Sequence, residues 1–355
     1  MRSTASRVLL WLAASMSLAM VAGPSFCQQP QGSQPAPVQG FHLIAKYNVG
    51  GDGGWDYLSA DSIARRLYIA RSNRVIVLDL DKGTVAGEIP NTNGVHGVAV
   101  ANDLGRGFVS CGLDGKVEIF DLKTLKPILE VKAGGNPDAI IYDLSTSRVF
   151  AFNGGSSDVT AIDAAKGTVV GTIPLGGKPE FAASDGRGTV FVNIENKSEV
   201  VAFDSKKLSI KARWPIAPGE EPTGLAMDRE HRRLFIGCSN KKMIIMDADS
   251  GRVITAIPIG AGVDANGYDP ATELAFSSNG DGTLTVVHED SPDKFTVVDT
   301  VKTEPGARTM TIDSKKHTVI VVTADFTPPP VATPERPHPR PGIAPNSFRV
   351  LVFGR

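Results

Sequence analysis

Short apolar segments that end in a polar residue recur along the chain at a nearly constant interval. Five of them end alike, as VIVLD (75–79), VEIFD (117–121), VTAID (159–163), EVVAFD (199–204) and MIIMD (243–247). Their terminal aspartates lie 41 to 43 residues apart, and LTVVH (284–288) and RVLVF (349–353) continue the series as divergent copies. A fixed period of this length indicates a repeat architecture in which each copy forms one supersecondary unit.

Each repeat predicts four short strands. In the second copy the apolar segment GVAVA (97–101) precedes a turn and the strand GFVSC (107–111), and a Gly/Asp-rich hairpin then leads to VEIFD. In the third copy the aspartate-ending strand is followed by a turn and by TVVGTIP (168–174). Four short strands per repeat of about 42 residues are typical of a propeller blade. The sequence therefore predicts an all-β, seven-bladed β-propeller.

The two ends of the repeat region predict how the ring closes. Residues 41–51 read as an outer strand with no three strands before it, whereas the C-terminal segment supplies three strands with no fourth after it. The N-terminal strand should therefore complete the last blade, which removes exposed sheet edges. We expect residues 41–355 to form one domain.

The N-terminus predicts export. Arg2 and Arg7 precede the apolar run VLLWLAASMSLAMVAG (8–23), which ends at Pro24. This is the pattern of a secretory signal peptide, assigned to residues 1–27, with cleavage after Gly23 or after Cys27. A polar, disordered linker is expected over residues 28–40. The mature protein should be periplasmic or secreted, without a transmembrane span.

Composition and charge narrow the range of partners. Charged residues make up 21% of the chain and apolar ones 41%, and the net charge is −1. Loss of the signal peptide makes the mature chain more acidic, so no basic surplus exists to neutralise phosphates and nucleic acid is not an expected partner. Cys111 and Cys238 lie in blades that are not neighbours, so both are expected to be buried free thiols.

Two stretches carry a resemblance to a known family. They are PNTNGVHGVAVANDLGRGFVSCGLDGKVEIFD (90–121) and PLGGKPEFAASDGRGTVFVNIENKSEVVAFD (174–204). They resemble the YVTN-type, 40-residue repeat propellers, and the chain over residues 41–355 is similar to the YncE-like members of that WD40/YVTN-like group. The resemblance implies the propeller fold. It does not imply an activity, because propellers serve many functions.

One column of the repeat alignment holds a polar residue just before every inner strand. Its members are Asp56, His96, Asp138, Glu180, Thr223, Asp264 and Arg308. Inner strands begin at the mouth of the central channel, so these seven side chains should form a ring around one opening. The simplest interpretation is that they hydrate the channel mouth, with Arg308 neutralising Asp56 and Asp264. The alternative is that His96, Asp138 and Glu180 bind a divalent metal ion, since one imidazole and two carboxylates suit Zn²⁺ or Mn²⁺.

A proline-rich insert interrupts the last blade. Residues 326–346 replace the tight hairpin of the other blades and contain eight prolines. Such a segment cannot pair as a strand. By connectivity it should emerge beside Arg308 and Asp56, either as a lid or partner surface or as a disordered decoration.

These observations predict a binding module rather than an enzyme. We expect a monomer that binds an unknown protein or small molecule at the channel mouth. The alternative is a metal-dependent, lactonase-like hydrolase that uses the polar ring. The chain contains no HExxH, GxSxG, P-loop or haem motif, so the only cofactor to consider is that divalent metal.

Overall fold

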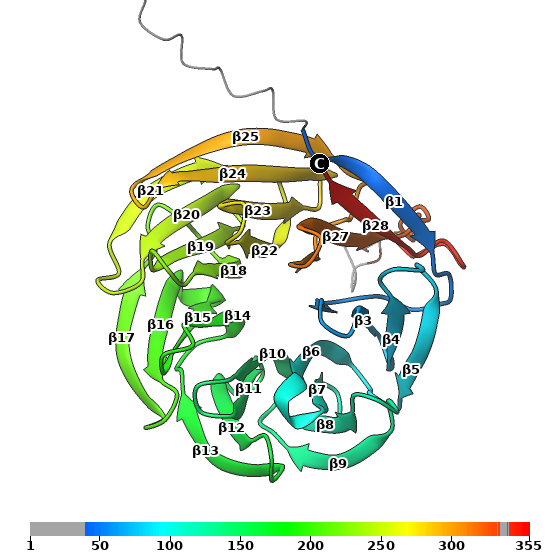
Figure 1. The fold of residues 1–355 in the computed structure, drawn as a ribbon, viewed down its shortest axis with the longest axis horizontal. Coiled ribbons are helices and arrows are strands. Elements are labelled where there is room, and N and C mark those ends of the chain that lie inside the picture. Colours follow the sequence, from blue (N-terminus) through cyan, green and yellow to red (C-terminus); the bar gives the residue numbers. More distant parts are fainter. Residues whose placement is uncertain (1–39, 332, 334–338, 340) are drawn as a thin grey trace, which may run out of the picture. The chain divides into compact units, whose positions relative to one another are not determined.

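The structure is a computed structural model that describes residues 40–331, 333, 339 and 341–355. The described residues form seven four-stranded antiparallel sheets arranged as blades around a central opening (Figure 1). The predicted seven-bladed, all-β propeller is confirmed. The described chain contains two helical segments, the single 3₁₀ turns η1 (Asn102–Leu104) and η2 (Glu195–Lys197).

Each blade runs from an inner strand to an outer strand in chain order. Blades 1 and 2 consist of β2 (Leu58–Asp61), β3 (Arg66–Arg71), β4 (Arg74–Asp79), β5 (Val85–Pro90), and β6 (Val95–Ala101), β7 (Arg106–Cys111), β8 (Lys116–Asp121), β9 (Pro127–Lys132). Blades 3 and 4 consist of β10 (Pro137–Asp143), β11 (Arg148–Asn153), β12 (Asp158–Asp163), β13 (Thr168–Pro174), and β14 (Pro179–Ser184), β15 (Thr189–Ile194), β16 (Glu199–Asp204), β17 (Ser209–Pro215). Blades 5 and 6 consist of β18 (Pro222–Asp228), β19 (Arg233–Cys238), β20 (Lys242–Asp247), β21 (Val253–Pro258), and β22 (Val263–Asp269), β23 (Leu274–Asn279), β24 (Thr283–Ser291), β25 (Lys294–Lys302).

The seventh blade joins the two ends of the described chain. It consists of β26 (Met310–Asp313), β27 (Thr318–Thr323), β28 (Arg349–Gly354) and the N-terminal strand β1 (His42–Asn48), which pairs antiparallel with β28 (Figure 1). β1 is therefore the outer strand of the last blade, the position expected from the sequence. This pairing covers the backbone edge of β28 that would otherwise be exposed.

The core lies between the blades, where the middle strands bury apolar side chains on both faces. Phe150 of β11 contacts Phe203 of β16 in the next blade, with ring centroids 5.3 Å apart. Within blade 4, Phe191 of β15 stacks on Trp214 of β17. Cys111 and Cys238 are buried free thiols, as predicted, and burial raises the pKa of each to about 12.

The recurrent aspartates at the ends of the third strands stabilise the turns that follow them. One carboxylate oxygen of Asp79 accepts hydrogen bonds from the backbone amides of Asp81 and Lys82. These amide hydrogen bonds hold the pKa of Asp79 below its ordinary value. The same arrangement recurs at Asp121, Asp163, Asp204 and Asp247. The repeat motif is thus explained by turn geometry.

Two sequence predictions fall on other parts of the chain. The signal peptide assigned to residues 1–27 and nearly all of the linker assigned to residues 28–40 lie outside the described residues. Among the described residues, no helix is long and apolar enough to cross a membrane.

Candidate functional site

The predicted ring residues lie at the start of the inner strands, and most of them sit on irregular backbone. In blades 2 to 6 the pairing between the inner and second strands shifts register at this point, for example between Val95 and Val98 and between Pro137 and Ile140. The skipped positions include His96, Asp138, Glu180, Thr223 and Asp264. A β-bulge re-aims a side chain out of the regular alternation, which explains how polar groups are placed at the mouth while the strand stays apolar.

Buried polar side chains on the second strand of one blade hydrogen-bond to the backbone of ring residues in the next blade. Ser110 of β7 donates to the carbonyl oxygen of Asp138 at 2.5 Å. Asn193 of β15 donates to the carbonyl oxygen of Thr223 at 2.9 Å, and Ser278 of β23 donates to that of Arg308. Ring residues in blades 3, 5 and 7 are thus held in place by their neighbours, so the ring is built across blade interfaces.

Three residues from blades 1 to 3 converge most closely. The Nδ1 atom of His96 lies 2.6 Å from Oδ2 of Asp56 and 3.5 Å from Oδ1 of Asp138. Burial lowers the pKa of His96, but the two carboxylates and the side chain of Asn136 outweigh it and raise the pKa to about 9. In the absence of other ligands, this group is therefore an imidazolium between two carboxylates.

Glu180 belongs to a neighbouring cluster. Its carboxylate accepts a hydrogen bond from Lys178 Nζ at 2.6 Å, and the Tyr57 hydroxyl lies 3.4 Å from its other oxygen. Lys178 also contacts Glu195. Burial, together with the negative charge of Asp138, raises the pKa of Glu180 to about 8. Of the three predicted metal ligands, the structure brings His96 and Asp138 together, whereas Glu180 is paired with Lys178. The third ligand atom near His96 and Asp138 belongs to Asp56 instead.

The remaining ring residues lie on blades 5 to 7. The Thr223 hydroxyl donates to the carbonyl oxygen of Val263 at 3.1 Å. Arg308 is half-exposed, and its Nε lies 3.4 Å from Oδ2 of Asp264. No ion pair between Arg308 and Asp56 is found among the described residues. Burial raises the pKa of Asp264 to about 6, although Arg308 opposes this shift.

A pocket of about 490 Å³ adjoins the ring beside the proline-rich insert. Trp55, Arg308, Phe326 and Ile343 are among the residues that line it. Phe326 and Ile343 form an isolated antiparallel bridge, and the Trp55 ring packs 5.4 Å from that of Phe348. The described part of the insert thus lies beside Arg308, as expected from connectivity, and beside Trp55, the residue before Asp56. Trp55 is partly buried, packs against the core and also lines this pocket.

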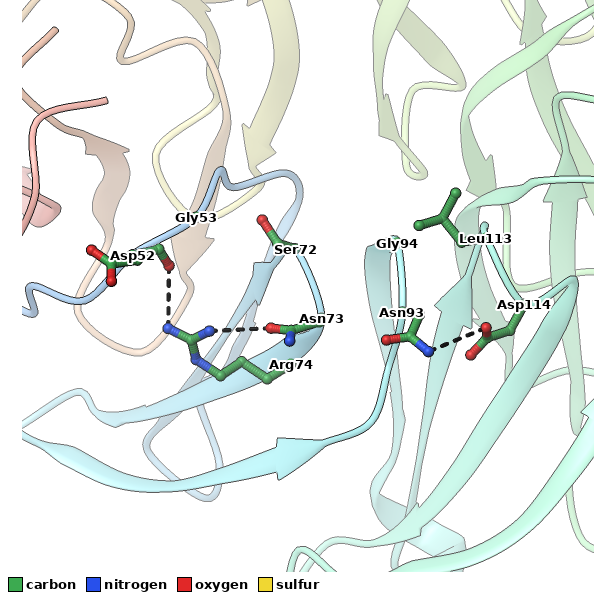
Figure 2. Close-up of a pocket in the computed structure, with 9 residues that line it drawn as sticks. All are labelled: Asp52, Gly53, Ser72, Asn73, Arg74, Asn93, Gly94, Leu113 and Asp114. Atoms are coloured by element: carbon green, nitrogen blue, oxygen red, sulfur yellow. Dashed lines mark hydrogen bonds between the residues drawn. The ribbon is translucent and has the colours of Figure 1, made fainter. Parts of the chain in front are cut away.

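A second hollow lies over the loops of blades 1 and 2 (Figure 2). Its polar groups largely bind one another: Arg74 donates to the carbonyl oxygen of Asp52 at 3.2 Å, and Asn93 donates to Asp114 at 3.3 Å. Because these groups are already paired and exposed, we consider the ring to be the stronger candidate for a binding site.

Sequence reasoning did not find three residues of this site. Tyr57, Asn136 and Lys178 each lie one or two positions away from a ring residue. Tyr57 is buried, and the surrounding carboxylates add to the effect of burial in raising its pKa well above its ordinary value. The lysine in KPE (178–180) was the available signal, because it stands only two residues before Glu180 and carries the opposite charge.

Comparisons with known proteins agree on the fold. A chain from the crystal structure of a mitotic checkpoint complex is 14% identical with a TM-score of 0.70, and the match covers 95% of this chain and 99% of that chain. The WD40 repeats of RRP9 are 10% identical with a TM-score of 0.70, covering 88% and 97%. The comparison with protein-family models gives no match, and that with curated protein sequences gives no significant match. The protein therefore has the seven-bladed β-propeller fold, which it shares with these structures.

The charge state of His96 provides a direct test of the site geometry. A pKa of about 9 in the folded protein, above the ordinary 6.5, means that the imidazolium stabilises the fold below pH 6.5 and that this stabilisation is lost as the pH rises through 9. We expect His96→Gln to cost about 3 kcal/mol at pH 6 and little at pH 10. NMR titration of the imidazole and urea unfolding at both pH values measure this. A His96 pKa near 6.5 would show that the two carboxylates do not hold it.

Proposed function

We propose that this chain is a ligand-binding module and that its ligand binds at the ring of polar side chains around the channel mouth. The observation that carries the proposal is the burial of Asp138, Glu180 and Asp264 at one mouth, where burial raises the pKa of each. Ionised carboxyl groups at buried positions reduce the stability of the fold. The fold does not require them there, because blades 5 and 7 hold Thr223 and Arg308 in the same column. Strongly perturbed carboxyl groups gathered in a cleft are a common feature of functional sites.

The charge of the ring indicates the ligand chemistry. The ring contains four carboxylates and three cationic groups, which are His96, Lys178 and Arg308. Two of the cationic groups, His96 and Lys178, already pair with a carboxylate at 2.6 Å. A protein or small molecule that presents cationic or hydrogen-bond-donating groups would complement the remaining acceptors. The half-exposed Arg308 and the pocket beside the insert would contact the less polar part of the ligand.

Affinity capture from an extract of the source organism tests the proposal. We expect the wild-type protein to retain a partner that Asp138→Asn/Glu180→Gln retains at least about tenfold less, a loss of about 1.4 kcal/mol. Asp249→Asn is the matched control, because it removes an exposed carboxylate near the end of a third strand, on the opposite face. Equal capture by all three proteins would refute binding at the ring. Deleting residues 327–345 tests the insert separately.

A metal-dependent hydrolase of the lactonase-like kind is the second candidate. It is favoured by the ligand atoms of Asp56, His96 and Asp138, which all lie within 4.8 Å of one another. One imidazole and two carboxylates would suit Zn²⁺ or Mn²⁺. Elemental analysis should then show an ion that is lost in Asp138→Asn. A metal content that this variant leaves unchanged would exclude the mouth as a metal centre.

We further propose that the protein is exported and belongs to the YVTN-type, YncE-like propellers. The basic and apolar pattern of residues 1–24 and the two motif stretches support this proposal. N-terminal sequencing of the mature protein should begin at Pro24 or Gln28. A mature chain that still begins at Met1 would contradict export.

A further inference from the structure

A second cluster of ionisable side chains lies between blades 5 and 6, on the face opposite the ring. Asp228 ends β18, His231 follows in the turn before β19, and Glu289 lies near the end of β24. The Nδ1 atom of His231 lies 2.8 Å from Oδ2 of Asp228 and 3.2 Å from Oε1 of Glu289. Blades 5 and 6 are neighbours in the ring (Figure 1), so the cluster bridges one blade interface.

Glu289 is out of place in the repeat. Its backbone amide donates a hydrogen bond to the carbonyl oxygen of Glu273. In five other blades the residue that directly follows the third strand makes the equivalent hydrogen bond, so these residues occupy the same position as Glu289. In those blades the residue is apolar or small: Leu80, Leu122, Ala164, Ser205 and Ala248. Glu289 is only 3% exposed, and neither of its carboxylate oxygens has a hydrogen-bond partner. A buried carboxylate in this position needs a cation or a proton.

His231 faces both carboxylates and carries at most one positive charge, when protonated, and the other nearby basic groups do not supply a second one. In blades 7 and 6 the aspartate at the end of the inner strand pairs with a basic residue of the next blade, as Asp313 does with Arg65 at 2.7 Å and Asp269 with His317 at 2.9 Å. The corresponding residue opposite Asp228 is Glu273, which adds negative charge. The charge of Arg233 acts on Glu289, but its guanidinium group is bound to Asp247 at 2.8 Å.

The geometry around His231 also differs from that of an ordinary ion pair. Its Nδ1 is buried and lies close to two carboxylate oxygens, yet it has no hydrogen bond of acceptable geometry with either. The Tyr268 hydroxyl also lies close to Glu289 and interacts with its carboxylate, although neither carboxylate oxygen has a hydrogen bond of good geometry. The nitrogen and oxygen atoms of the cluster thus lie about 3 Å apart without hydrogen bonding. This spacing suits atoms that all bind one small ion, since each would lie about 2.0 to 2.2 Å from a bound Zn²⁺.

We propose that Asp228, His231 and Glu289 bind one divalent transition-metal ion, with Zn²⁺ as the best-matched ion, which joins blades 5 and 6. The three ligand atoms lie within 4.8 Å of one another, and two carboxylates with one imidazole would neutralise the ion. His231 is one-third exposed, so the ion can enter from solvent and keep water in its open positions. Because the ligands come from two blades, the ion would stabilise their interface.

Zinc binding by the purified full chain tests the proposal. The Asp138→Asn background removes the candidate metal set at the channel mouth, so that only the new site is measured. After chelation and dialysis, calorimetry with ZnCl₂ should show one ion per chain and a higher melting temperature with zinc. Adding Glu289→Gln should weaken binding at least about tenfold, since loss of even an outer-shell partner costs about 10- to 100-fold. His317→Gln is the matched control, because His317 pairs with Asp269 in the same way without a second buried carboxylate, and it should bind zinc normally.

Two further measurements keep the result decisive. If Glu289→Gln does not fold by circular dichroism, His231→Gln replaces it, since this partly exposed side chain is removed without opening the core. Co²⁺ bound at the site should give visible absorption bands that either variant removes. The proposal is overturned if the background protein binds no zinc, or if Glu289→Gln binds zinc as tightly as its parent. It is also overturned if Glu289→Gln raises the melting temperature while zinc has no effect, because Glu289 is then simply protonated.

Discussion

Replacement of Asp138 by asparagine should raise the stability of the protein at pH 8 and leave it nearly unchanged at pH 4. Burial, reinforced by the charge of Asp56, raises the pKa of Asp138 to about 6 from an ordinary 3.8, although His96 opposes the shift. When a carboxyl group has a raised pKa in the folded state, the protein loses stability as the pH rises from the pKa of the unfolded state to that of the folded state. Ionisation therefore costs about 3 kcal/mol by pH 8, and Asn avoids this cost. This cost already includes the opposing charge of His96, 3.5 Å away, so the expected gain is about 3 kcal/mol.

Urea unfolding of both proteins at pH 4 and pH 8 measures this effect. Asp79→Asn is the control with the opposite sign, because turn amides lower the pKa of Asp79 and its charged form stabilises the fold. The control should therefore lose stability at pH 8. If Asp138→Asn were destabilising at pH 8, Asp138 would serve the fold rather than the proposed binding site. Stabilisation together with loss of the captured partner would identify a site where function is maintained at a cost in stability.

Replacement of Phe41 by alanine should destabilise the protein by about 3 kcal/mol, the usual cost of truncating a buried phenylalanine. Phe41 directly precedes β1 and is only 7% exposed. Its ring packs edge-on against Phe276 of blade 6 at 5.2 Å, and its backbone amide donates to Asp299 Oδ2 at 3.1 Å. Phe41 therefore attaches the closing strand to the neighbouring blade as well as to its own.

Leu43→Ala is the matched control, because Leu43 lies in the same strand and is 45% exposed. It should change stability by less than about 0.5 kcal/mol, as surface substitutions usually do. Urea unfolding followed by tryptophan fluorescence measures both variants. Similar small effects would show that the N-terminal strand contributes little to ring closure. Association of Phe41→Ala into dimers would instead indicate that β1 detaches and exposes the edge of β28.

The ring illustrates how far column alignment of a repeat can go. The repeat places His96 at the same position as Asp138 and Glu180, and the structure has all three at the starts of inner strands. Alignment could not choose the partners, because these depend on side-chain direction across blade interfaces. His96 contacts Asp56 of the preceding blade most closely, at 2.6 Å, whereas Glu180 turns to Lys178. The bulges that direct these side chains leave no clear mark in the sequence.

The second cluster shows the reverse case. The departure of Glu289 from the apolar or small residues of its column was visible in the sequence, since it follows LTVVH directly. Its significance was not, because Asp228 and His231 lie 61 and 58 residues earlier and belong to the preceding blade. Only the packing of blade 5 against blade 6 brings the three together.

The sequence by itself determined the number of blades, their strand order and the polar column at the inner strands. These features depend on local periodicity, turn chemistry and the count of strands at each end, all of which are encoded within single repeats. Tertiary structure alone decided which ionisable groups meet, how deeply they are buried and how their pKa values shift. Those properties arise between repeats, where Coulomb interactions and loss of solvent depend on distances of a few ångströms that no repeat specifies.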